Sequence, residues 1–166
     1  MTRTRPLQIL ILCTGNSARS LLGEALLNHH AAGRWQAHSA GSQPKGTPHP
    51  LALQTLQAHH IDITGLRSKS WNEFASPAAS TLDAVITVCD NAANEVCPIW
   101  HGAPVTVHWG IADPAAALGS EADQRAAFEQ AFNILNHRIQ RMARLPLEQY
   151  EPAQLKATLT ALAEEG

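Results

Sequence analysis

The chain has 166 residues, 45% of them hydrophobic, which is enough for one well-buried domain and too short for two of ordinary size. Its formal net charge of −2 and pI near 6.5 show no basic excess, so neither nucleic acid nor an anionic membrane is expected as a partner. The sequence has no apolar run long enough to span a membrane and no signal-peptide pattern, so we expect a cytoplasmic protein.

The first predicted elements are a strand and a helix joined by a short loop. Residues 7–12 are apolar almost throughout, as in a strand that is covered on both faces. Apolar residues at helical spacing from Leu21 to Leu26 then predict a helix that runs to about His30. The Ala32-Gly33 pair ends this helix.

The next part of the chain is predicted to hold one strand and two short helices. These elements are a strand over residues 35–40, a helix over residues 51–59 and a helical piece over residues 71–79. Pro and Gly residues mark residues 44–50 as a loop, and the polar residues 66–70 form another.

The last part of the chain is predicted to hold two strands and two helices. The expected elements are strands over residues 84–89 and 105–108, a long helix over residues 120–143 and a final helix over residues 151–163. Asp90 is expected to cap a helix that follows the first of these strands. In the long helix, apolar side chains recur every three or four residues at Phe128, Phe132, Leu135, Ile139 and Met142, which indicates one buried stripe.

Strands that alternate with helices predict an α/β fold with a parallel sheet and right-handed crossovers. Ligands of such sheets bind at the carboxyl ends of the strands. Cys13, Cys89 and Asp113 each come just after a predicted strand. The sequence therefore predicts that these three reactive groups share one edge of the sheet.

Residues 13–20, Cys-Thr-Gly-Asn-Ser-Ala-Arg-Ser, form the loop between the first strand and the first helix. A loop over a helix N-terminus points backbone N–H groups at one spot, and the helix dipole favours an oxyanion there. Arg19 is able to close this cradle with a planar guanidinium, while Ser17 and Ser20 offer hydroxyls. In such a field a cysteine has a pKa of roughly 3.5–7.5, so Cys13 is predicted to be a nucleophile rather than an inert buried side chain.

Two further cysteines, Cys89 and Cys97, make three in all, an odd number that favours reduced or catalytic thiols over structural disulfides. If the segment between them were helical, their α-carbons would lie about 12 Å apart, beyond the limit of about 7 Å for a disulfide. A segment able to unwind would let them pair by thiol exchange, and Pro98 favours fraying. The alternatives are two inert core cysteines or half of a metal site with His101 and His108, although their spacing is uncommon for zinc.

The Cys-x5-Arg-Ser pattern of Cys13 to Ser20 resembles the phosphate-binding loop of low-molecular-weight protein tyrosine phosphatases. The sequence of this loop is most similar to that of their relatives, the thioredoxin-coupled arsenate reductases. The segment Glu95-Val96-Cys97-Pro98 and the motif His108-Trp109-Gly110-x-x-Asp113-Pro114 extend this resemblance over most of residues 7–145. The resemblance implies a single-domain, three-layer α/β/α fold over residues 1–166, with a four-stranded parallel sheet, a core of about 7–145 and a C-terminal helical extension over 146–166.

The resemblance also implies a reaction, the reduction of arsenate to arsenite without an organic cofactor. Cys13 would attack arsenic, with Arg19 holding the oxyanion and Asp113 protonating the departing oxygen. Cys89 would then attack Cys13, and Cys97 would attack Cys89. The electron donor to the final disulfide would be thioredoxin, although glutaredoxin with glutathione serves some relatives.

The resemblance assigns two sets of binding residues. The sequence departs from the family pattern in two places, at Ala18 and in the helix after Pro146, which extends beyond the compact family core. The oxyanion loop comprises Thr14, Gly15, Asn16, Ser17, Ala18, Arg19 and Ser20. Asn16, Glu24 and Ser39 match positions that hold a potassium ion in some members. Ala18 stands where many members have a Cys, at a position that the thiol relay does not need.

Two other functions stay open from the sequence. A phosphatase acting on a protein or a small ester would use Cys13, Arg19 and Asp113 alone. Members with that activity usually have an aromatic residue after Asp-Pro, whereas here Ala115, Ala116 and Ala117 follow. A non-catalytic redox sensor would form the Cys89–Cys97 disulfide without turnover. Arsenate, with phosphate and sulfate as competitors, is the expected ligand, and the chain is expected to act as a monomer.

The remaining polar residues are predicted to have structural roles. His29, His30, His59 and His60 are interpreted as helix caps or surface residues, and Trp109 as a packing residue. His137, Arg138, Arg141 and Arg144 are expected on a solvated helix face. Asp113-Pro114 taken alone would also fit an ordinary turn.

Overall fold

A four-stranded parallel sheet forms the centre of the computed structural model, which describes residues 5–75, 81–88, 100 and 102–164. The strands are β1 (Leu7–Leu12), β2 (Trp35–Ala40), β3 (Ala84–Thr87) and β4 (Val105–His108), in the order β2-β1-β3-β4. The residue ranges of β1, β2 and β4 agree with the sequence prediction. The α/β fold with a four-stranded parallel sheet is confirmed.

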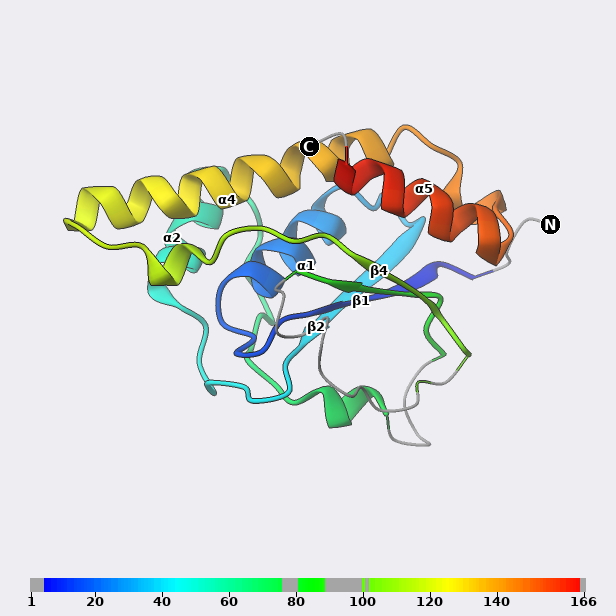
Figure 1. Ribbon diagram of the computed structural model, residues 1–166, viewed down its shortest axis with the longest axis horizontal. Helices are drawn as coiled ribbons and strands as arrows, with labels where there is room; N and C mark the ends of the chain where they lie inside the picture. The colour runs from blue at the N-terminus through cyan, green and yellow to red at the C-terminus, as the bar shows by residue number, and fades with distance from the viewer. Residues whose placement is uncertain (1–4, 76–80, 89–99, 101, 165–166) are drawn as a thin grey trace.

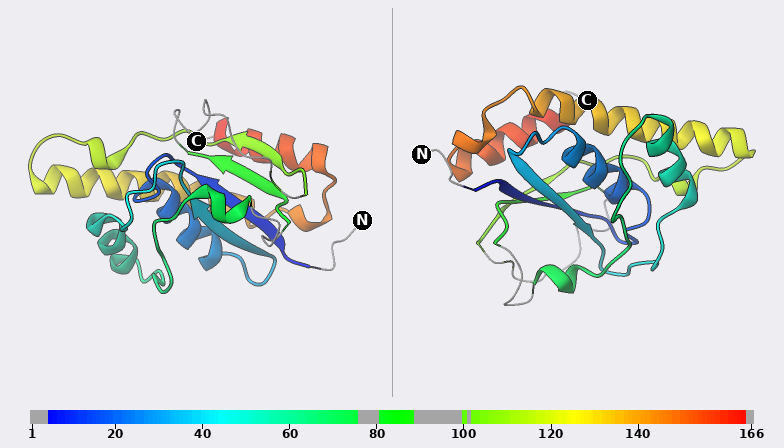
Figure 2. Two further views of the ribbon diagram at one scale, coloured as in Figure 1. Left: turned by 90° about the horizontal axis from the view of Figure 1, so that it is seen from below. Right: turned by 180° about the vertical axis from the view of Figure 1, so that it is seen from behind.

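Within the described ranges, four α-helices and three short 3-10 helices lie around this sheet (Figure 1). They are α1 (Arg19–His29), α2 (Pro50–Ala58), α4 (Glu121–Met142) and α5 (Pro152–Glu164), with η1 (Trp71–Phe74), η2 (Pro114–Ala116) and η3 (Leu147–Gln149). Helices α1, α4 and α5 lie on one side of the sheet, and η1 lies on the other (Figures 1 and 2). Phe74 of η1 packs there against His38 of β2, with ring centroids 5.5 Å apart.

The hydrophobic core lies between the sheet and these helices. All six residues of β1 are buried, as expected for a strand with neighbours on both sides and cover on both faces. The predicted apolar stripe of α4 is confirmed, because Phe128, Phe132, Leu135, Ile139 and Met142 are all buried. The core therefore holds β1 in place. Because Cys13 follows β1 directly, its position is fixed by the same packing.

Helix ends are fixed by local side chains. Ser120 and Asp123 form a capping box at the start of α4, each bonding the other's backbone N–H at 3.2 and 3.0 Å. At the start of α2, His49 Nδ1 accepts the Leu51 N–H at 3.1 Å. Burial, with a smaller contribution from Lys45, lowers the His49 pKa and so favours the neutral ring that this acceptor role requires.

Helix α5 packs on β4 and completes the core at that edge. Its side chains Leu155, Leu159 and Leu162 are buried, and the Leu159 carbonyl accepts the indole N–H of Trp109 at 2.8 Å. Trp109 is fully buried, which agrees with its predicted packing role. The residues after 146 are therefore joined to the sheet rather than attached loosely to it.

Arg34, just before β2, ties the α4–α5 connection to the sheet. Its guanidinium donates two hydrogen bonds to the Glu148 carboxylate, at 2.7 and 2.9 Å, and further bonds to the carbonyls of Ala143 and Leu145. These contacts raise the pKa of Arg34 and lower that of Glu148, so both groups are charged near neutral pH.

Three sequence predictions need correction. The helix predicted over residues 71–79 is a 3-10 turn at Trp71–Phe74, and residues 76–80 lie outside the described residues. The strand predicted over residues 84–89 ends at Thr87. Arg138 is not on a solvated face but 7% exposed, because α5 packs against α4 beside it and the Ala163 carbonyl accepts from its NH2 at 3.3 Å.

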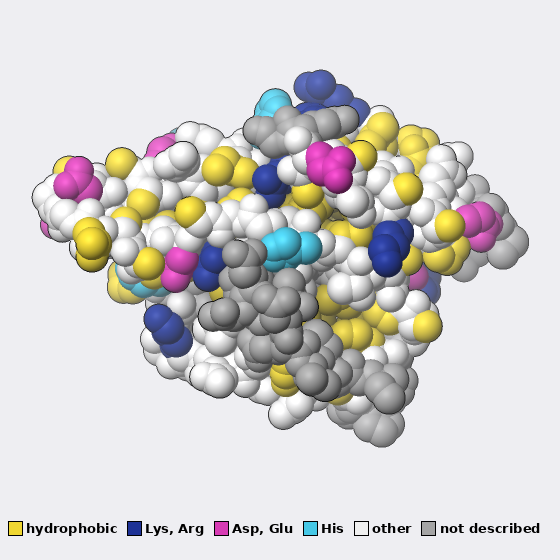
Figure 3. All heavy atoms as spheres, viewed as in Figure 1, with side chains coloured by type: hydrophobic (Ala, Val, Ile, Leu, Met, Phe, Trp, Pro, Cys, Tyr) yellow, Lys and Arg dark blue, Asp and Glu magenta, His cyan; other side chains and the backbone are white. Residues whose placement is uncertain are grey.

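The face of the molecule seen in Figure 3 shows no bias towards one charge. On the face in Figure 3, Lys and Arg side chains alternate with Asp and Glu and with scattered apolar groups, without a continuous basic patch among the residues drawn in colour. Within the ranges that the structure describes, no helix combines the length and hydrophobicity needed to cross a membrane.

Candidate active site

A cavity of about 250 Å³ opens at the carboxyl end of β1. It is lined by Cys13, Thr14, Gly15, Ser17, Ala18, Arg19, Gln43, Lys45, Asp113 and Ala115. Because the strands are parallel and in register, the loops after β1, β2 and β4 meet at this one edge. The structure thus brings Cys13, Arg19 and Asp113 together.

The loop after β1 is held by the segment that follows β2. The backbone N–H groups of Gln43, Lys45 and His49 donate to the carbonyls of Thr14, Gly15 and Ser17, at 3.0, 2.9 and 2.8 Å respectively. In a trans peptide the N–H points opposite to the C=O. With these carbonyls bound to the neighbouring segment, the N–H groups on the other side of the same peptides are available to an oxyanion.

Gly41 permits this close approach. A Cβ at residue 41 would lie 2.3 Å from the Thr14 carbonyl oxygen and 2.7 Å from the Cys13 carbonyl oxygen. Both contacts are to backbone, which cannot rotate away as a side chain can. The shape of the loop therefore depends on a residue without a side chain at position 41.

The N-terminus of α1 points at the cavity without a side-chain cap. Ala18 occupies the N-cap position, has no side-chain hydrogen bond to offer, and lines the cavity. The first turn contains no acidic residue to offset the positive end of the helix. Uncapped N–H groups and an uncompensated dipole are the features that stabilise a bound anion.

Arg19 begins α1 and reaches across the cavity toward the β4 loop. Its Nη1 donates to the Ile111 carbonyl at 3.0 Å, and its Nη2 lies 3.7 Å from Asp113 Oδ2. Its side chain is only 13% exposed, and its Nε is buried and has no hydrogen-bond partner among the residues that the structure describes. A buried, unsatisfied N–H is costly, so this donor is well suited to a ligand oxygen.

Asp113 lies at the opposite wall. Its Oδ1 accepts the Ala115 N–H at 3.0 Å, which caps η2, and this side chain is 41% exposed. The contact with Arg19 and the cap fix the carboxylate beside the cavity while leaving it open to solvent. That position suits a group that exchanges a proton with a departing oxygen.

The predicted oxyanion residues divide into two sets. Thr14, Gly15, Ser17, Ala18 and Arg19 line the cavity. Asn16 and Ser20 are fully buried beneath it, and Asn16 Nδ2 donates to Ser20 Oγ at 2.7 Å. Asn16 has a φ of 44°, which lies in the left-handed region that Asn tolerates better than most residues.

The residues predicted for potassium, Asn16, Glu24 and Ser39, do lie near one another, but they surround a lysine. Ser39 Oγ donates to Glu24 Oε1 at 2.6 Å, and Lys69 Nζ lies 3.5 Å from the same oxygen. A potassium ion and an ammonium about 4 Å apart would repel by about 4 kcal/mol in a partly buried setting. The residues present therefore do not fit a bound potassium ion.

Cys89, Asp90 and Cys97 lie outside the described residues, as does His101. His108 is described, and its Nδ1 is 2.7 Å from Thr87 Oγ1. Among the described ranges, no group of three or more His, Cys, Asp or Glu side chains is arranged to hold a metal ion.

Sequence reasoning missed three residues of the cavity wall, Gln43, Lys45 and Ala115. The stem of Lys45 covers Gly15, because a Cβ on that glycine would lie 3.3 Å from Lys45 Cε. The signal that could have revealed Lys45 is its place in the loop after β2, at the same sheet edge as Cys13.

Lys45→Met is expected to raise the KM for an oxyanion substrate about threefold to fivefold and to leave kcat nearly unchanged. An exposed lysine near an anion contributes about 1 kcal/mol or less, and Met keeps an apolar stem over Gly15. Steady-state kinetics at low ionic strength measure this change, with the exposed Lys156→Met as matched control. Added salt should weaken oxyanion binding, and so raise the KM, more in wild type than in the variant. An unchanged KM at low salt would exclude Lys45 as an oxyanion contact.

The sequence profile described as low molecular weight phosphotyrosine protein phosphatase matches residues 8–158. The chain belongs to this phosphatase family. Curated relatives of this phosphatase-family chain include proteins named arsenate reductase, from Bacillus licheniformis at 35% identity and from Bacillus subtilis at 32%. Each alignment covers 81% of this chain and 94% of the relative.

Solved structures of the phosphatase family agree with the fold. A thioredoxin-dependent arsenate reductase of Corynebacterium glutamicum matches with a TM-score of 0.64 and 25% identity, over 85% of this chain and 62% of that one. The tyrosine phosphatase Wzb of Escherichia coli K30, solved with sulphate, matches with a TM-score of 0.65 and 21% identity over 82% of this chain and 96% of its own. At that identity the second likeness concerns the fold alone.

Proposed function

We propose that this phosphatase-family chain is an arsenate reductase that uses the cavity at Cys13 and takes its electrons from thioredoxin. The observation that carries the proposal is the cavity that unites Cys13, Arg19 and Asp113. It occurs in a chain whose curated relatives, at up to 35% identity, are named arsenate reductases. The cytoplasm is the location that fits this chemistry, because thioredoxin keeps thiols reduced there.

Arsenate is a tetrahedral oxyanion, and the proposed binding mode follows from the donors around the cavity. The N–H groups of residues 14–19 and the open end of α1 surround its oxygens. Arg19 supplies the unpartnered Nε and a second N–H in one plane, which suits two oxygens at once. Phosphate and sulfate have the same shape and are expected to compete.

The first proposed step forms a bond between sulfur and arsenic. The Cys13 thiolate attacks arsenic, and one hydroxyl group of the arsenate takes a proton from Asp113 and leaves as water. No electrons are transferred from sulfur to arsenic at this stage, so arsenic remains in its pentavalent state. Asp113 recovers its proton from solvent, to which it is partly exposed.

The second proposed step reduces arsenic. The Cys89 thiolate attacks Cys13 Sγ, a sulfur–sulfur bond forms, and the electron pair of the sulfur–arsenic bond goes to arsenic, which leaves as arsenite. Cys97 then attacks Cys89, releases Cys13, and leaves a Cys89–Cys97 disulfide. Thioredoxin reduces this disulfide and so restores the enzyme, with glutaredoxin and glutathione as the alternative donor.

A phosphatase activity is the second candidate, because the first step would also cleave a phosphate ester. One observation weighs against an aryl phosphate as the natural substrate. Among the described residues that line the cavity none is aromatic, and Ala115 stands on the wall after Asp113-Pro114. An aromatic side chain there would be needed to hold a phosphotyrosyl ring.

The test is arsenite production by the purified chain with thioredoxin, thioredoxin reductase and NADPH, compared with hydrolysis of p-nitrophenyl phosphate. A reductase gives arsenite in step with NADPH oxidation over many turnovers. Ester hydrolysis without arsenite would establish the phosphatase instead. Oxidation of Cys89 and Cys97 once per chain, without either product, would identify a redox sensor.

A further inference from the structure

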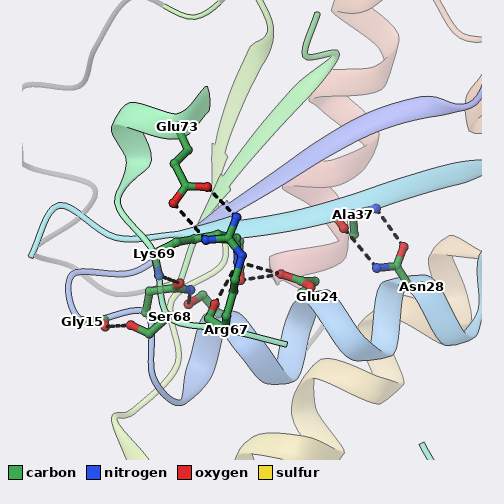
Figure 4. A network of polar contacts seen from close by, with 11 residues as sticks. Gly15, Glu24, Asn28, Ala37, Arg67, Ser68, Lys69 and Glu73 are labelled. Carbon is green, nitrogen blue, oxygen red and sulfur yellow. Dashed lines mark hydrogen bonds and ion pairs between the residues drawn. The ribbon is translucent and has the colours of Figure 1, made fainter. Parts of the chain in front are cut away.

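The Lys69 ammonium lies beside Glu24 and Arg67, close to the oxyanion loop at Gly15 (Figure 4). Nζ donates to the Arg67 carbonyl at 2.9 Å and lies 3.5 Å from Glu24 Oε1. The Lys69 side chain is 7% exposed and that of Glu24 is 13% exposed. Lysine is almost never buried unless it is paired, so this residue has a specific electrostatic role at this position.

The groups around the Lys69 ammonium compensate its positive charge. Ser39 Oγ, from β2, donates to the same Glu24 oxygen at 2.6 Å. Burial lowers the Lys69 pKa and Glu24 opposes that change, while Arg67 is itself held outward by two hydrogen bonds to Glu73. One ammonium therefore faces one carboxylate and one carbonyl, in a space that a bound monovalent cation would otherwise need.

The segment that carries this lysine holds the oxyanion loop. The Lys69 N–H donates to Asn16 Oδ1 at 2.8 Å, and Asn16 in turn bonds Ser20 at the start of α1. Ser68 Oγ donates to the Gly15 carbonyl at 3.2 Å. The left-handed backbone of Asn16 is thus supported by the same short segment that the ammonium ties to Glu24.

From these contacts we infer that the Lys69 ammonium takes the place of a bound potassium ion, so that this chain positions its oxyanion loop without a monovalent cation. The inference rests on the proposed function only for its substrate. Lys69 is a positioning residue, because it acts through Asn16 and Gly15 and does not line the cavity. Two consequences follow: wild-type activity is independent of potassium, and removal of the ammonium creates a dependence on it.

The experiment compares wild type, Lys69→Ala and Lys69→Met in choline chloride and in KCl at equal ionic strength. Wild-type kcat and KM for arsenate are expected to agree within twofold in the two salts. Lys69→Ala should show a KM about tenfold higher in choline chloride, and KCl should recover most of that loss by occupying the vacated space beside Glu24. Lys69→Met fills the space without a charge. Its KM for arsenate should therefore rise as much as that of Lys69→Ala, and KCl should not restore it. Lys156→Ala, on an exposed face of α5, is the control.

A second readout is the melting temperature, which KCl should raise in Lys69→Ala and leave unchanged in wild type. A wild type whose kcat/KM rises more than threefold with KCl overturns the inference, and so does a Lys69→Ala variant with normal KM in choline chloride. If Lys69→Ala does not fold, the salt comparison on wild type and the KM of Lys69→Met still test the inference. If wild type reduces no arsenate, the same comparison with p-nitrophenyl phosphate tests the inference separately from the proposed function.

Discussion

Cys13→Ser is expected to lower both arsenate reduction and p-nitrophenyl phosphate hydrolysis by about 10⁴-fold or more, because a serine hydroxyl is a poor nucleophile without a base to activate it. Oxyanion binding should survive, since the donors come from the backbone and from Arg19. The change is nearly isosteric at a buried position, so the fold should also survive. Both activities, phosphate affinity by calorimetry and the melting temperature measure these expectations.

Cys97→Ser is the matched control for the loss of a thiol, because it also replaces one sulfur by oxygen but is expected to leave ester hydrolysis intact. If Cys13→Ser kept either activity, another residue would have to be the nucleophile. If the variant lost phosphate affinity along with activity, the loop itself would have changed shape, and the assignment of Cys13 would need a conservative second variant such as Cys13→Ala.

Cys97→Ser is expected to release about one arsenite per chain and then stop, even with excess thioredoxin, because the reaction ends at a Cys13–Cys89 disulfide. Cys89→Ser should release none by this route, since no thiol attacks Cys13 Sγ. Rapid quenching with arsenite quantification measures the stoichiometry, and mass spectrometry of the quenched Cys97→Ser chain identifies the disulfide.

Hydrolysis of p-nitrophenyl phosphate serves as the internal control, because it needs Cys13, Arg19 and Asp113 but not the two later cysteines. Sustained arsenite release by Cys97→Ser would contradict the relay. A fall in ester hydrolysis of more than about tenfold in either variant would show instead that these cysteines support the cavity.

The sequence predicted the sheet and the long helix well because their signals are local and strong. Residues 7–12 are apolar almost throughout, and the α4 stripe repeats over the whole helix, so both the type and the position of these elements were correct. Cys13, Arg19 and Asp113 could be found because each follows a strand or begins a helix. Their meeting at one edge follows from parallel strands alone.

The wrong placement of Arg138 and the omission of Lys69 and Lys45 have a common physical cause, which is contact between segments far apart in the chain. The pattern of α4 placed Arg138 away from the apolar stripe, but only the tertiary structure shows that α5 covers it. Lys69 lies in a polar stretch, and nothing nearby in the sequence indicates its burial against Glu24. Lys45 reaches Gly15 through backbone hydrogen bonds, which no side-chain pattern encodes.

The docking of α5 on β4 sets a minimum length for a working enzyme. Truncation after α4 would remove the acceptor of the buried Trp109 indole, at a cost of about 1–3 kcal/mol, and would expose the apolar surface under Leu159. Trp109 lies only a few residues before Asp113, so the damage would spread from the edge of the sheet to the cavity wall at Asp113. Engineered fragments that omit α5 would therefore be poor substitutes for the chain that contains it.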